Sequence, residues 1–171
     1  MEKKSMLKQF VVFKICEEEY GIDILRVKTI EKMSAITRVP KTPNYVKGVV
    51  NLRGEVVPII DLRQRFATEL CNFPSLDTKG NLEKEGILDK SLPNQITFKE
   101  TEDTRIIIVN ADDVVVGLIV DSASEVIEID NNLIEDPPES MGDIEVSGIS
   151  GIGKLNDRII IILDVYKMLN V

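Results

Sequence analysis

The sequence contains no histidine and no tryptophan, and only two of its 171 residues are cysteines. The lack of histidine removes the commonest general base near neutral pH, the usual catalytic triads and the histidine-containing metal sites. Cys16 and Cys71 are too few for a disulfide framework or a metal cluster. We therefore expect a protein without catalytic residues, without a metal site and without a cofactor.

Long apolar runs and an excess of positive charge are absent as well. No segment approaches the roughly 20 apolar residues of a membrane span, and Lys14 interrupts the N-terminal apolar run. The formal net charge of −8 repels nucleic acid, and aromatic residues make up only 5% of the chain. We expect a cytoplasmic protein with reduced thiols that neither binds nucleic acid nor inserts into a membrane.

The residues that are present indicate a folded protein rich in β-strands. The chain is 43% hydrophobic and 29% charged, which is typical of a globular protein. Isoleucine and valine dominate the apolar content, and their branched side chains favour sheet over helix. Asp61 is placed to cap a short helix that ends near Phe66. The predicted strands are Phe10–Cys16, Tyr20–Leu25, Val27–Met33, Val46–Leu52 and Val56–Ile60.

The second half of the chain repeats the first. "RIIIVNADDVVVGLIVDSASEVIEI" aligns with "QFVVFKICEEEYGIDILRVKTIEK" at a constant shift that places Gly117 on Gly21. "GIGKLNDRIIIILDVYKML" aligns without a gap with the stretch that begins at Gly48, which places Gly151 on Gly48. Closely spaced strands of this kind favour small barrels or a sandwich over a parallel α/β sheet.

The repeat predicts the organisation of the chain. Residues 9–67 form a first β-barrel half, and residues 104–171 form a second half with a helix at its end. The polar segment 68–103 between them is expected to be a long, partly flexible linker, since loops beyond about 15 residues are usually functional or mobile. We expect the two halves to pack together as one domain.

Two possible enzyme or nucleotide sites find little support. "GISGIGKL" fits the start of a phosphate-binding loop, but Leu155 stands where a hydroxyl would hold Mg²⁺, and a strand follows where a helix is required. A carboxylate-dependent enzyme would need Asp61, Asp121 and Asp164 to converge in a cleft. Convergence of these three side chains in a cleft would favour this alternative.

Arg53 stands out at the tip of a predicted hairpin, between the apolar runs of "GVVNLRGEVVPIIDLRQRF". Gly54 supplies the positive φ that a tight turn needs, but the turn does not require an arginine. Arg53 is therefore either a solvated turn residue or a binding residue. A guanidinium on a rigid hairpin can form two hydrogen bonds with a carboxylate while its stem packs on apolar surface.

Several segments together resemble the CheW family of bacterial chemotaxis adaptors. They are "EEEYGIDILRVKTIEKM", "ITRVPKTPNYVKGVVNLRGEVVPIIDLRQRF", "RIIIVNADDVVVGLIVDSASEV" and "GIGKLNDRIIIILDVYKML". The resemblance implies a mainly β protein, one CheW-like domain of two packed five-stranded barrels with short helices, and no enzymatic activity. It also implies an adaptor that couples the tips of chemoreceptors to the histidine kinase CheA. Such a protein is cytoplasmic and is recruited to membrane-associated receptor arrays.

The resemblance assigns protein-binding roles to individual residues. Arg53 matches an arginine implicated in coupling to receptor and kinase, and Val27 matches an apolar position on the receptor-contacting surface. Ile30 would be a second apolar anchor. Thr29 stands where many relatives have glutamate, and Glu31 lies two residues later, on the same face of a strand. We expect these five residues to contribute to the binding surface.

The resemblance also assigns supporting roles to glycines and leaves alternatives open. The glycines expected to support the interfaces are Gly48, Gly54, Gly117, Gly151 and Gly153. One alternative is a CheW-like module of another kinase pathway. The other is the N-terminal part of a CheV-type adaptor, which is disfavoured because the sequence stops at Val171, directly after the last predicted helix.

Overall fold

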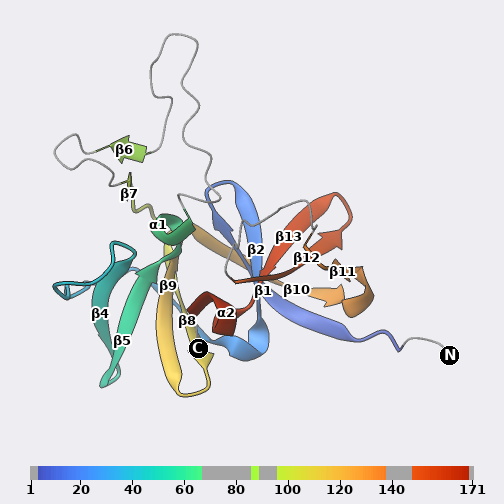
Figure 1. The fold of residues 1–171 in the computed structure, drawn as a ribbon, viewed down its shortest axis with the longest axis horizontal. Helices are drawn as coiled ribbons and strands as arrows, with labels where there is room; N and C mark the ends of the chain where they lie inside the picture. The colour runs from blue at the N-terminus through green and yellow to red at the C-terminus, as the bar shows by residue number, and fades with distance from the viewer. Residues whose placement is uncertain (1–3, 67–85, 89–95, 138–147, 170–171) are drawn as a thin grey trace, which may run out of the picture.

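Two β-sheets lie side by side in the computed structural model, which describes residues 4–66, 86–88, 96–137 and 148–169 (Figure 1). The strands are β1 (Leu7–Ile15), β2 (Glu18–Asp23), β3 (Val27–Lys32), β4 (Val46–Leu52), β5 (Glu55–Asp61), β6 (Gly86–Leu88), β7 (Ile96–Phe98), β8 (Arg105–Ala111), β9 (Val114–Val120), β10 (Ser122–Asp130), β11 (Ile134–Glu135), β12 (Ile149–Leu155) and β13 (Arg158–Leu163). The helices are α1 (Leu62–Phe66), α2 (Val165–Leu169) and the 3₁₀ turns η1 (Ile24–Arg26) and η2 (Asn131–Leu133).

The predicted mainly β class is confirmed. Sheet A has six strands in the order β10-β1-β2-β13-β12-β11, and sheet B has five strands in the order β3-β8-β9-β5-β4. Sheet A lies on the right of Figure 1 and sheet B on the left, with α2 between them. The hairpin of β6 and β7 falls in the predicted linker and pairs separately from both sheets.

The registers of the two sheets confirm the internal repeat. In sheet A, β13 pairs in parallel with β2, and Ile162 lies opposite Gly21. In sheet B, β5 pairs in parallel with β9, and Ile59 lies opposite Gly117. These pairs are equivalent under the repeat because it relates Gly21 to Gly117 and the β4–β5 hairpin to the β12–β13 hairpin. The same strand arrangement therefore occurs twice.

The two sheets do not coincide with the two halves of the sequence. Sheet A combines β1 and β2 from residues 9–67 with β10 to β13 from residues 104–171, and sheet B combines β3 to β5 with β8 and β9. The structure differs here from the expectation that each half forms its own barrel. Exchange between the halves lets each β1-type hairpin pair in parallel with a hairpin of the other half, which covers edges rich in isoleucine and valine.

Each sheet curls because the strand at one edge continues toward the strand at the other. In sheet A, β10 leads through η2 into β11, and Ile134 of β11 lies opposite Gly153 of β12. In sheet B, the chain after β3 returns to β4, where Thr37 and Val49 donate backbone hydrogen bonds to each other at 2.9 Å. Both sheets are therefore barrel-like.

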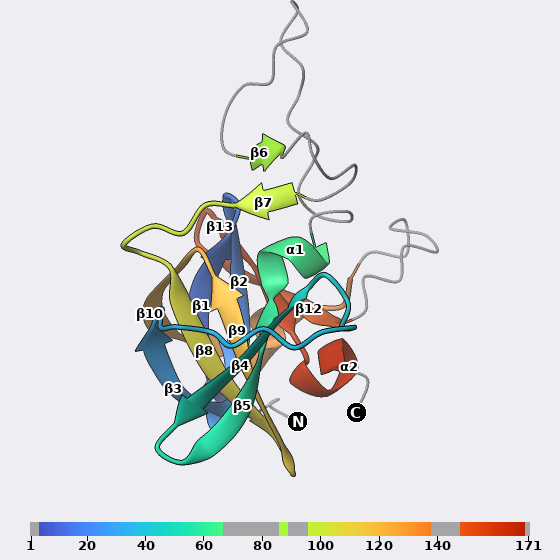
Figure 2. The same cartoon turned by 90° about the vertical axis from the view of Figure 1, so that its left-hand side faces the viewer.

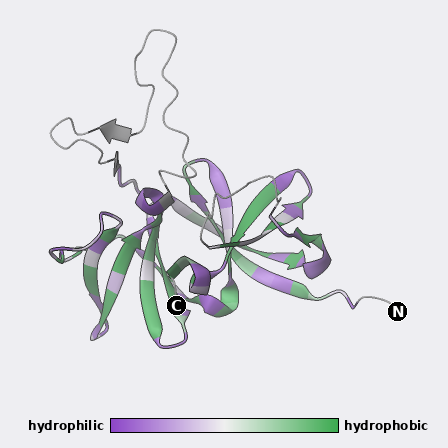
Figure 3. Cartoon of the chain, in the orientation of Figure 1, coloured by the Kyte–Doolittle hydropathy of each residue, from purple (hydrophilic) through white to green (hydrophobic). Residues whose placement is uncertain are grey.

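Buried side chains form one core inside each sheet and a third core between the sheets. Strand β8 contributes to two of them. Ile106 and Ile108 face the core of sheet B, whereas Ile107 and Val109 face the core between the sheets. Figure 3 shows β8 and β9 as mainly hydrophobic ribbons. The apolar run of β8 is continuous rather than alternating because both faces of the strand are buried.

Cys16 differs from the sequence-based expectation of reduced thiols. It lies half-buried at the β1–β2 turn with a φ of 57°, and it is disulfide-bonded. Its side chain packs against the core between the sheets. Cys71 lies outside the described residues.

No helix in the described ranges combines the length and the apolar character that crossing a membrane requires.

Candidate functional site

The β4–β5 hairpin holds Arg53 in a fixed backbone conformation. Arg53 has a φ of 52° and Gly54 a φ of 87°, as a type I′ turn requires at its two central positions. The side-chain oxygen of Asn51 accepts a hydrogen bond from the backbone N–H of Gly54 at 2.9 Å, which closes the turn. The predicted hairpin tip is confirmed, and its arginine projects from a rigid base.

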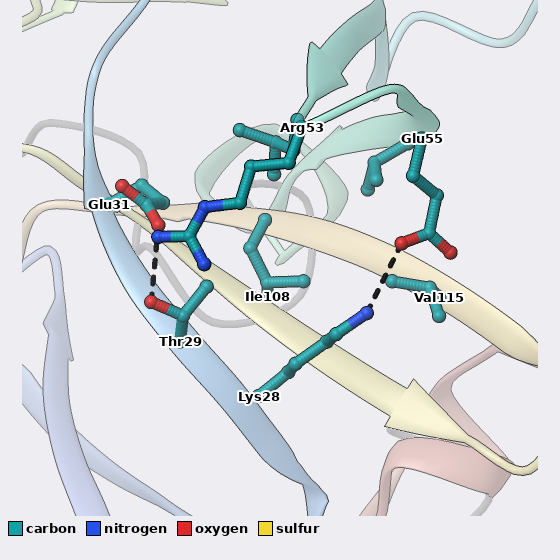
Figure 4. Close-up of a pocket in the computed structure, with 9 residues that line it drawn as sticks. Lys28, Thr29, Glu31, Arg53, Glu55, Ile108 and Val115 are labelled. Atoms are coloured by element: carbon teal, nitrogen blue, oxygen red, sulfur yellow. Dashed lines mark hydrogen bonds and ion pairs between the residues drawn. The ribbon is translucent and has the colours of Figure 1, made fainter.

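A shallow pocket of about 190 Å³ lies beside this turn. Its apolar lining comes from β4, β5, β8 and β9 and consists of Leu52, Val57, Ile108 and Val115. Figure 4 shows the Arg53 side chain extending across the pocket toward the strand that carries Thr29 and Glu31. The pocket therefore combines an apolar lining with polar groups at its rim.

A β-bulge in β3 brings Lys28 to the rim of this pocket. Val27 pairs with Val109 and Thr29 pairs with Ile108, so Lys28 is an extra residue between two consecutive partners. The Lys28 ammonium forms an ion pair with the Glu55 carboxylate at 3.1 Å. Sequence reasoning missed this pair because no residue pattern in β3 marks the bulge.

The polar side chains at the rim differ in whether they have a hydrogen-bond or ion-pair partner. Thr29 donates its hydroxyl hydrogen bond to Glu31 at 3.1 Å, and Lys28 is paired with Glu55. Within the part of the chain that the structure describes, the Arg53 guanidinium has neither a hydrogen bond nor an ion pair. Arg53 is thus an uncommitted cation beside an apolar surface, the combination that suits a partner carrying a carboxylate next to an apolar side chain.

At the equivalent position in sheet A, the charged side chains pair with one another. The repeat relates Glu55 to Arg158, and Arg158 forms ion pairs with Glu19 at 2.9 Å and with Glu125. The hydrogen bond from Arg158 holds the pKa of the Glu19 carboxyl below its usual value, although burial opposes the shift. The repeat relates Arg53 to Asn156, so this end also lacks a free guanidinium. The two ends of the duplicated fold are therefore chemically different.

The three carboxylates that a carboxylate-dependent enzyme would need do not share one set of partners. Asp61 and Asp121 both pair with Arg63, at 3.0 Å and 3.3 Å. Asp164 instead accepts hydrogen bonds from the backbone N–H groups of Tyr166 and Lys167 and caps α2. The Asp61 oxygen accepts from the Arg63 backbone N–H at 3.0 Å, which confirms the predicted helix cap. The arrangement fixes helix ends and holds no open carboxylate pair.

The buried Arg63 remains charged. Burial disfavours its charge, but the hydrogen bonds and charges of Asp61 and Asp121 outweigh burial and raise its pKa. Its guanidinium also donates to the Lys99 carbonyl oxygen at 3.2 Å and so fastens the segment before β8. Sequence reasoning missed Arg63, although its position two residues after a helix-capping aspartate was visible. Among the described residues, no group of three or more metal-binding side chains is clustered.

Comparison with known proteins identifies the family. Residues 9–171 match the family model described as a CheW-like domain. The chemotaxis protein CheW of Helicobacter pylori is 37% identical over 98% of this chain and 85% of its own length. CheW of Klebsiella aerogenes is 33% identical over 95% of this chain and 81% of its own length. The crystal structure of the scaffolding protein TtCheW from Thermoanaerobacter tengcongensis superposes with a TM-score of 0.73 at 36% identity and covers 97% of this chain and 94% of that one.

The chain belongs to the CheW family. The resemblance inferred from the sequence motifs is therefore confirmed, and the protein is a chemotaxis scaffold of the CheW type.

The five binding residues expected from the CheW resemblance lie on two faces of β3 and at the β4–β5 turn. Thr29, Glu31 and Arg53 meet at the pocket. Val27 and Ile30 lie opposite Val109 and Ile107, so they share the face of β3 that looks toward the core between the sheets. Ile30 is 41% exposed, and Val27 is half-buried. The structure therefore separates these apolar anchors from the arginine pocket.

The glycines expected to support the CheW interfaces lie at close backbone contacts, except at the turn. Gly48 has a φ of 142°, and a Cβ there would lie 2.0 Å from the carbonyl oxygen of Thr37. A Cβ at Gly117 would lie 2.4 Å from the Ile59 side chain. Gly151 and Gly153 similarly face Ile134 and Ile129, whereas Gly54 faces open space. Their part in binding remains a prediction.

Proposed function

We propose that this protein couples the tips of chemoreceptors to the histidine kinase CheA, and that Arg53 is a principal contact residue. The observation that carries the proposal is the unpaired Arg53 guanidinium on a rigid turn, beside a pocket with an apolar lining, in a chain of the CheW family. Arginine is enriched among the residues that dominate binding energy at protein interfaces. Recruitment to membrane-associated receptor arrays follows from this role.

The pocket suggests how a partner would bind. Receptor tips are helical hairpins, so an apolar side chain of a helix can enter the lining formed by Leu52, Val57, Ile108 and Val115. A carboxylate one turn away on that helix can then form two hydrogen bonds with Arg53. The exposed pair Lys28–Glu55 borders this position and contributes little to affinity because both side chains are about half exposed.

The apolar face of β3 is a second part of the proposed surface. Val27 and Ile30 lie on the face of β3 away from the Arg53 pocket, where Val27 packs against the core between the sheets and Ile30 is 41% exposed. A partner that contacts both parts has to wrap around β3, or two partners have to bind on opposite sides of the strand. We assign Val27 and Ile30 to one partner and the Arg53 pocket to the other, because one helix cannot reach both faces of a strand.

The experiment measures binding of the full chain to a receptor-tip fragment and to the CheA regulatory domain by titration calorimetry. Arg53→Ala should weaken binding to one of the two partners by about 30-fold, which corresponds to a loss of about 2 kcal/mol at a residue that dominates an interface. Asn156→Ala is the matched control, because it alters the equivalent turn of sheet A without touching the pocket. Unchanged affinity of Arg53→Ala for both partners would contradict the assignment of Arg53.

Ile30→Ser separates the two parts of the surface. It should weaken binding to the partner that Arg53→Ala spares, since Ile30 and Arg53 lie on different faces. Equal loss of the same partner in both variants would show that a single partner covers β3 on both sides and would overturn the division.

A further inference from the structure

The loop that joins β3 to β4 carries only positive charge. Residues 37–45, here called the basic loop, contain Arg38 and Lys41 and no carboxylate, and Lys47 follows at the start of β4, in a chain with a formal net charge of −8. Residues 38–44 are exposed, and Val39 is 40% exposed among the cations. Arg38 and Lys41 lie three residues apart in this exposed segment.

The protein does not neutralise these charges itself. In the ranges that the structure describes, none of the three side chains has an ion pair or a hydrogen bond. Some other exposed cations are paired, such as Lys28 with Glu55 and Lys154 with Glu135. Unpaired charges of one sign in a short exposed segment favour an anionic partner.

The basic loop is held rigidly. The Thr42 hydroxyl donates to the Val39 carbonyl oxygen at 3.0 Å, and the Val46 backbone N–H donates to the Pro43 oxygen at 3.0 Å. The Tyr45 carbonyl oxygen accepts from the Asp61 N–H at 2.7 Å, and the Arg65 guanidinium lies 4.8 Å from the centre of the Tyr45 ring. A loop that is already ordered loses little conformational entropy when a partner binds.

The internal repeat allows the charge of the basic loop to be compared with that of the equivalent connection in the other copy. The equivalent connection between β10 and β12, residues 131–148, has no cation and carries the carboxylates Glu135, Asp136, Glu139, Asp143 and Glu145. The duplicated fold therefore does not require positive charge at this connection. The basic loop is a property of one copy alone, as expected of a surface with its own binding role.

We propose that the basic loop docks a carboxylate-rich segment of a partner protein. The site is separate from the Arg53 pocket, because the loop and the β4–β5 turn lie at opposite ends of β4 (Figures 1 and 2). Charge complementarity selects an anionic partner, and Val39 offers an apolar contact between the cations. A protein segment fits better than nucleic acid because Arg65 covers Tyr45, the ring in the loop on which a base could stack.

The test uses the full chain, labelled with ¹⁵N, and a short oligo-glutamate peptide as the probe. The variant Arg38→Glu/Lys41→Glu reverses the charge of the loop, and Lys8→Glu/Lys14→Glu makes the same change in net charge at exposed positions of β1. The peptide should shift backbone amide signals of the basic loop in the wild-type protein. Affinity should fall about tenfold or more in the loop variant and far less in the β1 variant, and it should decrease as salt is added.

Three outcomes would overturn the proposal. Equal loss of affinity in both variants would show that only the net charge matters. Tighter binding of a single-stranded DNA oligonucleotide or of vesicles containing phosphatidylserine through the same amides would assign the loop to another class of partner. Retained affinity in Arg38→Gln/Lys41→Gln, which removes the two charges without introducing new ones, would exclude a direct role for these cations. The result does not depend on receptor or CheA binding, so it stands apart from the proposed function.

Discussion

Arg53 and Asn156 occupy the same position in two copies of one hairpin turn, with φ angles of 52° and 54°. Asparagine tolerates this left-handed conformation well, whereas a longer side chain such as arginine is disfavoured there. Because Gly54 follows position 53, an asparagine there would complete Asn-Gly, the preferred centre of a type I′ turn. The copy in sheet A carries the residue that suits the turn, and the copy in sheet B carries a residue that suits binding.

The first prediction follows from the opposite effects of Arg53 on the stability of the turn and on binding. Arg53→Asn should raise the free energy of unfolding by up to about 1 kcal/mol, because it relieves the left-handed arginine. The same variant should lose binding to the partner that contacts Arg53. Urea unfolding measures the stability, and calorimetric titration measures the binding.

The reciprocal variant serves as the control. Asn156→Arg should lower the free energy of unfolding by a similar amount and leave partner binding unchanged. A decrease in stability on Arg53→Asn would show that the arginine supports the turn, and the argument for a binding role would lose its structural basis.

The second prediction concerns the buried cluster around Arg63. The side chains of Arg63 and Asp61 are 4% and 1% exposed. Arg63→Met removes the cation and leaves the Asp61 carboxylate buried without it, which should cost about 3–5 kcal/mol of stability. The double variant Asp61→Asn/Arg63→Met should recover part of this loss because the buried charge is then absent.

An exposed ion pair provides the comparison for this prediction. Lys28→Met should change the free energy of unfolding by less than about 1 kcal/mol, since the side chains of Lys28 and Glu55 are each 52% exposed. A similar loss in Arg63→Met and Lys28→Met would show that burial does not set the value of the Arg63 cluster.

Sequence patterns predicted local structure well because local rules govern it. The Arg53-Gly54 tip follows from turn chemistry, and the cap by Asp61 follows from helix chemistry. The internal repeat was visible as two alignments with constant shifts. Pro58 lies in the inner strand β5, but the pairing of β5 with β9 begins only at Ile59. The missing N–H of Pro58 is therefore tolerated.

The features that sequence did not predict depend on which strands pair. Alternation along a strand shows that one face is buried but does not identify the neighbour, so the exchange of strands between the halves was not predictable. The bulge at Lys28 gives Thr29 and Glu31 to the pocket and Ile30 to the opposite face. One inserted residue thus decided which predicted site residues meet.

The third prediction concerns acid stability and Arg158. The hydrogen bond from Arg158 lowers the pKa of the Glu19 carboxyl in the folded protein. A group with a lowered folded pKa stabilises the protein above its unfolded pKa, and this contribution is lost as the pH falls through the folded pKa. Arg158→Gln should therefore reduce stability at neutral pH but change it little at the acidic end.

Urea unfolding of the wild-type protein and of Arg158→Gln across acidic and neutral pH measures this difference. Lys154→Gln, which removes an exposed ion pair on the neighbouring strand β12, is the control and should give a nearly constant difference. A constant difference for Arg158→Gln as well would mean that Arg158 acts through packing rather than through the charge of Glu19.

The fourth prediction concerns alkaline pH and Tyr20. Burial, with a smaller contribution from the charge of Glu18, raises the pKa of Tyr20 to about 12. An acid whose pKa is raised by folding stabilises the protein below its unfolded pKa, and this contribution disappears as the pH rises toward the folded value. Tyr20 should therefore resist ionisation in the folded protein and should promote unfolding once it ionises.

Ultraviolet absorbance of the phenolate measures the ionisation during an alkaline titration of the wild-type protein and of Tyr20→Phe. The difference between their curves isolates Tyr20 and should rise near pH 12 in the folded protein, compared with the ordinary value of 10.0 in denaturant. Coincident difference curves with and without denaturant would show that water reaches the Tyr20 hydroxyl. The stacked pair of Phe13 and Tyr20, with ring centres 5.8 Å apart, would then not seal the core between the sheets.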